Sequence, residues 1–310
     1  MSDPFDLGVL YTDYPALAAG TPLTSLWSYE SCARTVRRRR SSDRPHRPHE
    51  YWLHRSDPLL NTMLPGTHLS LVVNFGDSWV TGRSWPSSLL LPAISVIGPF
   101  TWPQFLRVGQ RVCAIGAVLP SVFAPDIFGV PASVLTNQIV RLGELWPREP
   151  VERLHTALSS RSLPGGLAVL RDAMLARMDP SARIDTLERC AARLLAARGG
   201  SVPVDRLAAH YGISRQRFSR RFHEAAGLPP KLFARIVRFQ GLVHSLLSTD
   251  VSQWAAVASD VGFYDQAHMI NEFRGFAGAA PTVFFQPHDD TIDASRIRVH
   301  GRPSEWLRPA

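Results

Sequence analysis

The sequence has 310 residues, of which 45% are hydrophobic, and its formal net charge at pH 7 is +8. This length is sufficient for two domains with separate hydrophobic cores, and this composition excludes a wholly disordered chain. No run of eighteen apolar residues and no cleavable leader occur, so we expect a cytoplasmic protein with no membrane partner. The positive charge favours polyanions as partners, although proteins of ribosomes and membrane surfaces share this property.

The three cysteines, Cys32, Cys113 and Cys190, lie far apart in the sequence. They offer no metal-ligand spacing and indicate no disulfide framework. We expect small buried side chains at these positions, and neither a metal nor a cofactor.

The first part of the chain predicts β-structure. An opening strand is predicted at Leu26–Tyr29. The stretch Thr35–His49, which contains Arg37–Arg40 and two prolines, predicts a loop that is either simply solvated or an additional phosphate-binding arm. Further strands are predicted at Leu69–Phe75, Leu89–Ile97 and Arg111–Leu119. Short strands at this spacing are typical of a sandwich or a small barrel.

A helical pattern extends from Ser121 to Met178. Apolar residues recur at helical spacing over Pro150–Ser160 and Leu163–Met178. Asp179–Ser181 then marks the predicted domain boundary, because a proline and small polar residues follow the last apolar position.

The stretch Val204–Phe222 predicts two helices joined by a tight turn. Gly212 can adopt the left-handed turn conformation without a Cβ clash, and Ser214 can cap the second helix. Phe218 and Phe222 are spaced i, i+4 and form the apolar side of that second helix. This arrangement is the helix-turn-helix of DNA-binding proteins, whose second helix enters the major groove.

The stretch Trp254–Phe273 repeats the same pattern. Gly262 occupies the turn, Asp265 is the predicted N-cap, and Met269 and Phe273 point inward. One such pattern is weak evidence, but two copies about fifty residues apart are hard to produce by chance.

The segment from about Ile184 to Pro287 resembles the DNA-binding domain of the AraC/XylS family of bacterial transcription regulators. The motifs that carry the resemblance are Ile213–Phe222, Ala226–Lys231, Val261–His268, Glu272–Arg274 and Gly278–Pro281. The resemblance implies seven helices, with two helix-turn-helix units bridged by a long helix at Pro230–Leu247. At 1.5 Å per residue this bridge is roughly 27 Å long, which suits two recognition helices about one DNA turn, ~34 Å, apart.

A second resemblance covers the first half of the chain, which is similar to the cupin-like sensor domains that precede many AraC-type domains. It is carried by Met63–Gly66, Val96–Phe100 and Ile127–Pro131, although Leu64-Pro65-Gly66 lacks the family's aspartate. The resemblance implies a small-molecule effector. The helices before the boundary either pair two copies in a homodimer or pack only within one chain. The candidate effector-lining aromatics, which are equally consistent with core positions, are Trp79, Trp85, Phe100, Trp102 and Phe105.

We therefore predict an α+β chain with three parts. Residues 1–179 form an N-terminal β-rich, cupin-like sensor or dimerisation domain with trailing helices. Residues 180–288 form an all-α domain of about seven helices with two helix-turn-helix motifs. Residues 289–310 form a loosely ordered tail, in which Ile297, Val299 and Trp306 could fold back.

The predicted function is sequence-specific regulation of transcription under the control of an effector, with double-stranded promoter DNA as partner and RNA polymerase as a further partner if the protein is an activator. The predicted DNA-binding residues are Ser214, Arg215, Gln216, Arg217, Ser219, Arg220, Asp265, Gln266, His268 and Asn271. By position in the motif, Gln216, Ser219 and Arg220 are expected to contact base edges. Arg215 and Arg221 are interpreted as solvated or phosphate-facing charges. The second unit offers fewer long donors, so we expect the first to carry most of the base recognition.

Two alternatives remain from other functional classes. One is a cupin-type enzyme that a DNA-binding module targets, and the other is a nucleoid protein that binds DNA without sequence preference. Cupin enzymes hold a metal with two His at i, i+2, a carboxylate and a later His. The histidines of the first half, His46, His49, His54 and His68, lack that spacing. We therefore predict no catalytic and no metal-binding residues.

Overall fold

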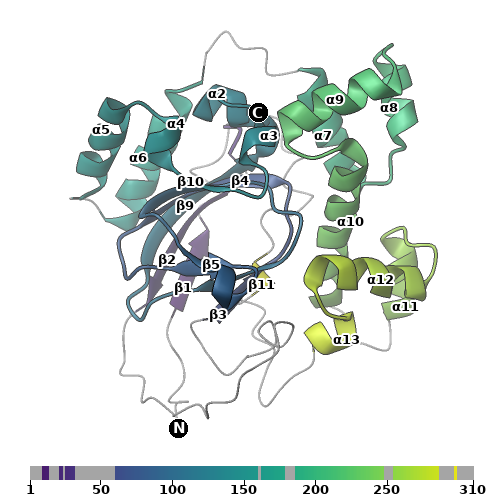
Figure 1. Ribbon diagram of the computed structural model, residues 1–310, viewed down its shortest axis with the longest axis horizontal. Helices are drawn as coiled ribbons and strands as arrows, with labels where there is room; N and C mark the ends of the chain where they lie inside the picture. Colours follow the sequence, from purple (N-terminus) through teal and green to yellow (C-terminus); the bar gives the residue numbers. More distant parts are fainter. Residues whose placement is uncertain are drawn as a thin grey trace.

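The computed structural model describes residues 9–13, 21–23, 25–31, 60–159, 162–178, 186–247, 254–285 and 297–298. Two β-sheets with covering helices form one side of the molecule, and a column of helices forms the other (Figure 1). The predicted Arg37–Arg40 loop lies outside the described residues.

The larger sheet has six strands that pair antiparallel throughout. Their spatial order is β1 (Val9–Asp13), β2 (Ser25–Ser31), β9 (Cys113–Pro120), β4 (His68–Asn74), β7 (Ile94–Ile97) and β10 (Ile139–Arg141). The predicted strands Leu26–Tyr29, Leu69–Phe75 and Arg111–Leu119 are therefore confirmed, as β2, β4 and β9.

The smaller sheet has five short strands. Their order is β11 (Ile297–Arg298), β3 (Leu60–Met63), β8 (Gln104–Arg107), β5 (Val80–Gly82) and β6 (Leu89–Leu90). Strand β11 pairs with β3 in parallel, and Ile297 lies opposite Thr62. Ile297 therefore folds back onto the smaller sheet, which is the alternative that the sequence left open for the tail. The rest of residues 289–310 lies outside the described residues.

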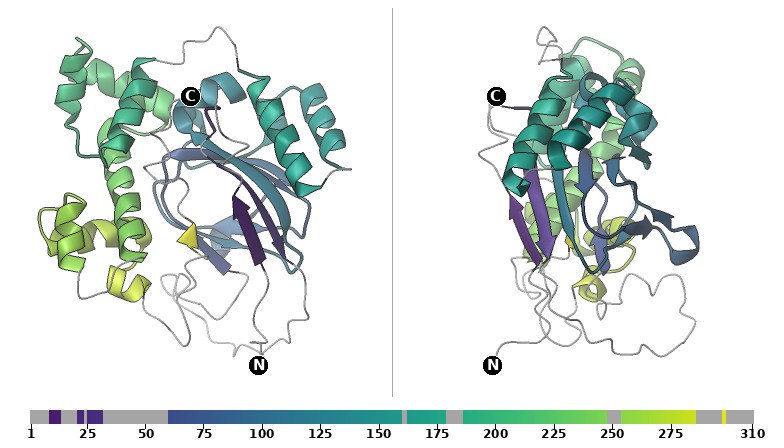
Figure 2. Two further views of the ribbon diagram at one scale, coloured as in Figure 1. Left: turned by 180° about the vertical axis from the view of Figure 1, so that it is seen from behind. Right: turned by 90° about the vertical axis from the view of Figure 1, so that its left-hand side faces the viewer.

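Strand β4 shows how the larger sheet separates two hydrophobic cores. Leu69, Leu71 and Val73 belong to the core beneath the helices α5 (Arg148–Ser159) and α6 (Leu163–Leu175), which cover the outer face of the sheet (Figure 2). Val72, one residue out of phase, belongs to the core between the two sheets. This alternation follows from the two-residue period of side chains along a strand.

Two expectations for the first domain are wrong. Leu89–Ile97 is not one strand, because β6 and β7 lie in different sheets, and the chain leaves strand geometry around Pro92, which cannot donate a backbone hydrogen bond. The stretch 121–178 is not purely helical, because β10 inserts an edge strand between short helices. Those short helices are η3 (Ser121–Phe123), α2 (Ala124–Phe128), α3 (Ala132–Leu135) and α4 (Leu142–Leu145). One more short helix, η2 (Trp85–Ser87), lies in the first domain between β5 and β6.

The described part of the C-terminal segment contains the seven helices expected from the resemblance. They are α7 (Leu187–Ala197), α8 (Val204–His210), α9 (Arg215–Ala226), α10 (Pro230–Leu247), α11 (Trp254–Asp260), α12 (Gln266–Ala277) and α13 (Pro281–Phe284). The bridging helix α10 has the predicted bounds.

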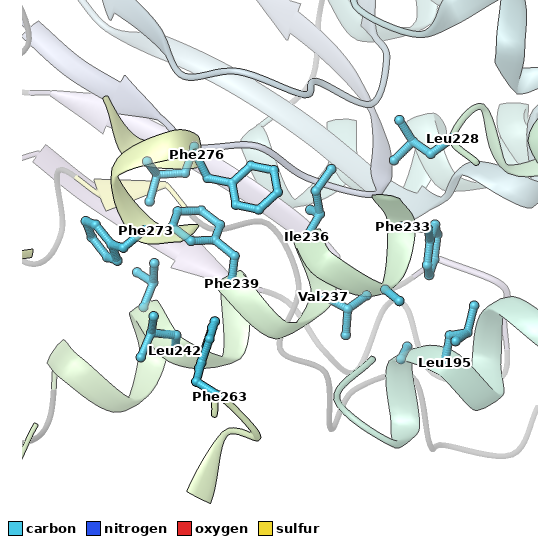
Figure 3. Packing of buried hydrophobic residues seen from close by; sticks show 14 of the residues in the cluster. Leu195, Leu228, Phe233, Ile236, Val237, Phe239, Leu242, Phe263, Phe273 and Phe276 are labelled. Atoms are coloured by element: carbon cyan, nitrogen blue, oxygen red, sulfur yellow. The ribbon is translucent and has the colours of Figure 1, made fainter. Parts of the chain in front are cut away.

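Helix α10 carries one continuous core for both helix-turn-helix units (Figure 3). Near its start, Phe233 meets Phe222 of α9 edge to face, with ring centroids 5.3 Å apart. Further along, Phe239 contacts Phe273 and Phe276 of α12 at 5.4 and 5.1 Å. The two units are therefore attached to one rigid element rather than to each other.

A close contact between β2 and β9 predicts an unequal response of two glycines to substitution. A Cβ on Gly116 would lie 2.3 Å from the Trp27 ring, whereas a Cβ on Gly143 in α4 would meet no atom within 4 Å. We expect Gly116→Ala to lower the free energy of unfolding by about 1–3 kcal/mol through overpacking. The control Gly143→Ala should be neutral or stabilising by up to about 1 kcal/mol. Urea unfolding measures both, and equal stabilities would contradict this packing.

Candidate nucleic-acid interface

The first helix-turn-helix owes its geometry to Gly212 and Ser214. Gly212 has φ +63°, in the left-handed region. The Ser214 side-chain oxygen accepts a hydrogen bond from the Arg217 N–H at 3.3 Å and so caps α9. Phe218 and Phe222 are completely buried against the core. The predicted turn residue, N-cap and apolar side are all confirmed.

The buried phenylalanines determine which side chains α9 presents to solvent. Gln216 and Arg220 are spaced i, i+4 on the side of the helix opposite Phe218 and Phe222, and both are exposed. Ser214, Arg215 and Arg217 are exposed as well, while Ser219 is partly buried. The structure therefore gathers the six predicted residues of the first unit at one helix and its N-cap, with Gln216 and Arg220 on the side opposite the core.

Two arginines of α9 have acidic partners that the sequence did not reveal. Arg215 pairs with Asp205 of α8 at 3.2 Å, and both side chains are well exposed. Arg221 pairs with the buried Glu188 of α7 at 2.7 Å. The interpretation of Arg221 as a solvated or phosphate-facing charge is therefore replaced by an ion pair that joins α9 to α7.

The second helix-turn-helix repeats the local geometry. Gly262 has φ +85°, and the Asp265 carboxylate accepts a hydrogen bond from the His268 N–H at 2.7 Å. The His268 ring lies edge to face against Phe263, and its Nδ1 accepts a bond from the Tyr264 N–H at 3.4 Å. His268 thus closes the turn through both its ring and its backbone N–H.

The second unit presents shorter side chains than the first. Met269 and Phe273 are buried and occupy the places of Phe218 and Phe222. In the same register, the exposed Ala267 and Asn271 stand where the first unit has Gln216 and Arg220. A methyl group and a short amide in the second unit thus replace a long amide and a guanidinium in the first. Gln266 is also exposed.

Sequence reasoning missed Tyr264, whose side chain is 93% exposed at the turn before α12. An aromatic residue normally gains free energy from burial, so one left in solvent is a candidate contact for a partner. The available signal was its position directly before the N-cap Asp265, within the helix-turn-helix motif.

An ion pair holds α12 against the bridging helix. The Arg235 guanidinium donates two hydrogen bonds to the Glu272 carboxylate, at 2.8 and 2.9 Å, and lies 5.2 Å from the centre of the Phe276 ring. The bonds from Arg235 hold the pKa of Glu272 below its ordinary value of 4.5. The same bonds raise the pKa of Arg235. This pair fixes the second recognition helix on α10.

The lowered pKa of Glu272 predicts a pH-dependent contribution to stability. A carboxylate whose pKa is lower in the folded state stabilises the fold above its ordinary pKa, and this contribution is lost as the pH falls through the folded-state value. Glu272→Gln should therefore lower the free energy of unfolding by about 1 kcal/mol at pH 7. The difference from wild type should shrink below pH 4.5.

Chemical unfolding between pH 7 and pH 3 measures this difference. The control is Glu224→Gln, which alters an exposed acid on α9. A difference that stays constant over the whole pH range would rule out a contribution from the charged Glu272.

The described residues contain neither a metal-binding cluster nor a membrane-spanning helix. Across these ranges, no group of three or more His, Cys, Asp or Glu side chains could hold a metal ion. His68 is buried on β4, and the other three histidines considered as metal ligands lie outside these ranges. Of the helices that the structure describes, none is long and apolar enough to cross a membrane.

Comparison with known proteins gives one family match and several distant structural likenesses. Residues 207–286 match a family model described as a helix-turn-helix domain, whereas no curated protein matches the chain. ToxT from Vibrio cholerae O395 is 9% identical, with 72% of this chain and 94% of ToxT covered and a TM-score of 0.40. The C-terminal domain of AraT, a response regulator from Geobacillus stearothermophilus, is 17% identical, with 37% and 99% covered and a TM-score of 0.30. The AraC-like transcriptional activator CuxR is 13% identical, with 82% and 85% covered and a TM-score of 0.29.

The family match concerns the C-terminal domain alone, and TM-scores this low support no argument about the rest of the chain. The matched residues include both turn glycines, Gly212 and Gly262, and both N-caps, Ser214 and Asp265. They also include the whole bridging helix α10. Residues 207–286 therefore form a helix-turn-helix domain with two such units on one bridging helix.

Proposed function

We propose that this chain is a sequence-specific transcription regulator that binds promoter DNA chiefly through α9, with α12 as a weaker second recognition helix. The observation that carries the proposal is the pair of capped recognition helices mounted on α10, each with the side opposite its buried aromatic or methionine anchors open to solvent. A DNA duplex repeats its major groove about every 34 Å, so two helices on one bridge of roughly 27 Å can enter successive turns.

The chemistry of the exposed side chains suits some of them to base contacts and others to phosphate contacts. Arg220 can pair bidentately with guanine and Gln216 with adenine, whereas Ser214, Arg215, Arg217 and Ser219 suit phosphates and the edges of the contact. In the second unit, Asn271 and Gln266 are the base-reading candidates, and His268 and Asp265 shape the turn. The exposed hydroxyl of Tyr264 is a further candidate for a phosphate contact.

A small-molecule effector is proposed for the first domain, on the basis of buried polar groups between the sheets. Ser70 lies two residues from Val72, Gln104 two residues from Leu106, and Ser95 is out of phase with Val96, so all three side chains face the inter-sheet space. Their neutral hydroxyl and amide groups suit an uncharged, hydrogen-bonding ligand. Of the aromatic candidates, Trp79, Phe100 and Phe105 are buried, whereas Trp85 is partly exposed and packs on Phe105.

This proposal includes the domain boundaries 1–179 and 180–288. It also includes a cytoplasmic location and, for an activator, contact with RNA polymerase. A homodimer through α5 and α6 has less support than intramolecular packing. The apolar side chains of these helices are buried within one chain, in the core between the helices and the larger sheet. They are Leu154, Leu158, Leu167, Leu170 and Met174.

The test is selection of fragmented genomic DNA by the purified full-length protein at near-physiological salt, followed by sequencing. A few strongly enriched sites with a shared motif support a specific regulator. Uniform retention of fragments would instead support the non-specific nucleoid protein, because phosphate contacts alone carry no sequence information.

The unequal side chains of the two recognition helices predict unequal effects of two alanine substitutions. Arg220→Ala should weaken binding to the selected site by about tenfold to a hundredfold and relax the base preference at one position. Asn271→Ala should weaken it by less than about threefold, because one short amide makes fewer contacts. Fluorescence anisotropy with specific and scrambled duplexes measures both, and equal losses of specificity would falsify the assignment of α9 as the main reader.

The pairing of Arg215 with Asp205 predicts a change in salt dependence. Asp205→Asn should release Arg215 to a phosphate, so the slope of log K against log salt should steepen by about one unit. The matched control is Glu152→Gln, which removes an exposed acid from its pair with Arg148 on α5 and changes the net charge equally. If the two variants keep the wild-type slope, Arg215 does not gain a phosphate contact in this way.

A further inference from the structure

The first domain contacts the end of the recognition helix α9 that points away from its DNA-facing start (Figure 1). The Ser121 hydroxyl of η3 donates a buried hydrogen bond to the Ala226 carbonyl at 2.7 Å. The Thr136 hydroxyl, which follows α3, donates to the Gly227 carbonyl at 2.6 Å. The last carbonyls of a helix have no partner within the helix, so these two hydroxyls satisfy groups that α9 itself leaves open.

An ion pair next to these bonds joins the first domain to α7. Asp126 of α2 accepts a hydrogen bond from Arg189, and their side chains are only 11% and 10% exposed. The Arg189 guanidinium also lies 4.4 Å from the centre of the Phe123 ring. A buried charge pair is expensive to break on one side, because the remaining charge loses its partner without regaining water.

The hydrophobic core of the helical domain continues into this contact. Leu64 and Val122 of the first domain belong to the same cluster as Phe218 and Phe222 of α9. We call the contact made by Ser121, Val122, Asp126 and Thr136 with α7 and α9 the α9 seat. It completes the core that holds α9.

Gly227 shows how closely the α9 seat fits. Its φ of +79° is in the left-handed region, and a Cβ there would lie 2.5 Å from Thr136 Oγ1 and 2.9 Å from the Ala132 carbonyl. Both the backbone conformation and the space exclude a side chain. The C-terminal end of α9 is therefore fixed against the first domain with little freedom to shift.

We propose that Ser121, Asp126 and Thr136 are positioning residues for DNA recognition by α9. Helix α9 has 12 residues and is about 18 Å long, so a tilt of about 5° at its seated end moves its DNA-facing end by about 1.5 Å. A displacement of this size breaks hydrogen bonds to base edges, whose donor and acceptor atoms must stay within about 0.5 Å of their preferred distance. The proposal rests on the proposed function, because it concerns the same recognition helix.

The α9 seat also gives the first domain a direct connection to DNA reading. Ser121 follows Pro120, the last residue of β9, and Val118 of the same strand lies in the core between the two sheets. A change in the packing between the sheets is thereby one short segment away from the end of α9. A ligand that changed the packing between the sheets would therefore act on α9 through η3 and the α9 seat.

The test uses the full-length protein with Asp126→Asn and Thr136→Val, which remove a charge and a hydroxyl while nearly preserving shape. Selection from a DNA library with both half-sites randomised reports the base preferences of α9 and α12 separately. We expect specific affinity to fall about fivefold to tenfold, as for loss of one charge-assisted or buried hydrogen bond, with base preference lost at the α9 half-site and kept at the α12 half-site. Asp126→Glu and Thr136→Ser should restore much of the preference, and Glu152→Gln is the control.

Two outcomes overturn the proposal. Unchanged preferences at the α9 half-site would mean that the contacts do not position α9, and equal loss at both half-sites would mean a general loss of stability. Hydrogen exchange of the free protein keeps this test separate from the proposed function. Faster exchange at the C-terminal amides of α9 in both variants is expected, and unchanged exchange overturns the proposal. If wild type selects no motif, the proposed function fails instead.

Discussion

The aromatic packing along α10 is the interaction on which the helical domain depends. Phe233 holds α9 and Phe239 holds α12, so the two recognition helices share one support and one continuous core. Their separation is then set by the rise of a helix, about 1.5 Å per residue, rather than by a flexible connection. Because the bridge is rigid, the conformational entropy of aligning the two recognition helices is lost during folding and is not lost again when both helices bind a duplex.

Local rules explain why the helical domain could be predicted from sequence almost to the residue. Gly212 and Gly262 take the left-handed conformation, Ser214 and Asp265 cap the following helices, and Pro230 begins the bridging helix. Each of these features depends on neighbours within a few positions. The strands were less predictable, because β10 exists only through its pairing with β7, from Ile139 opposite Ile97 onward. The break near Pro92 separates two sheets that the sequence pattern alone does not distinguish.

The candidate site shows the same limit. Motif position identified the exposed side chains of α9 and α12, including Gln216 and Arg220. It did not reveal which arginines are already engaged, because Arg221 and Arg235 find their acids, Glu188 and Glu272, more than thirty residues away. Nor could it place Thr136 beside Gly227, a contact that requires both domains to be folded. A sequence motif shows which residues are charged, whereas the tertiary structure decides whether a charged side chain is already paired or free to contact a ligand.

The return of the chain to the smaller sheet has a topological consequence. Strand β3 precedes the helical domain and β11 follows it, and the two strands pair in parallel. The helical domain is therefore an insertion within a β-domain, with a covalent connection to it at each end. Strain applied to one connection is shared by the other, and a single backbone cut between the domains leaves them attached. Full separation of the two domains requires β11 to detach from β3, so the pairing of Ile297 and Arg298 limits how far the domains can move apart.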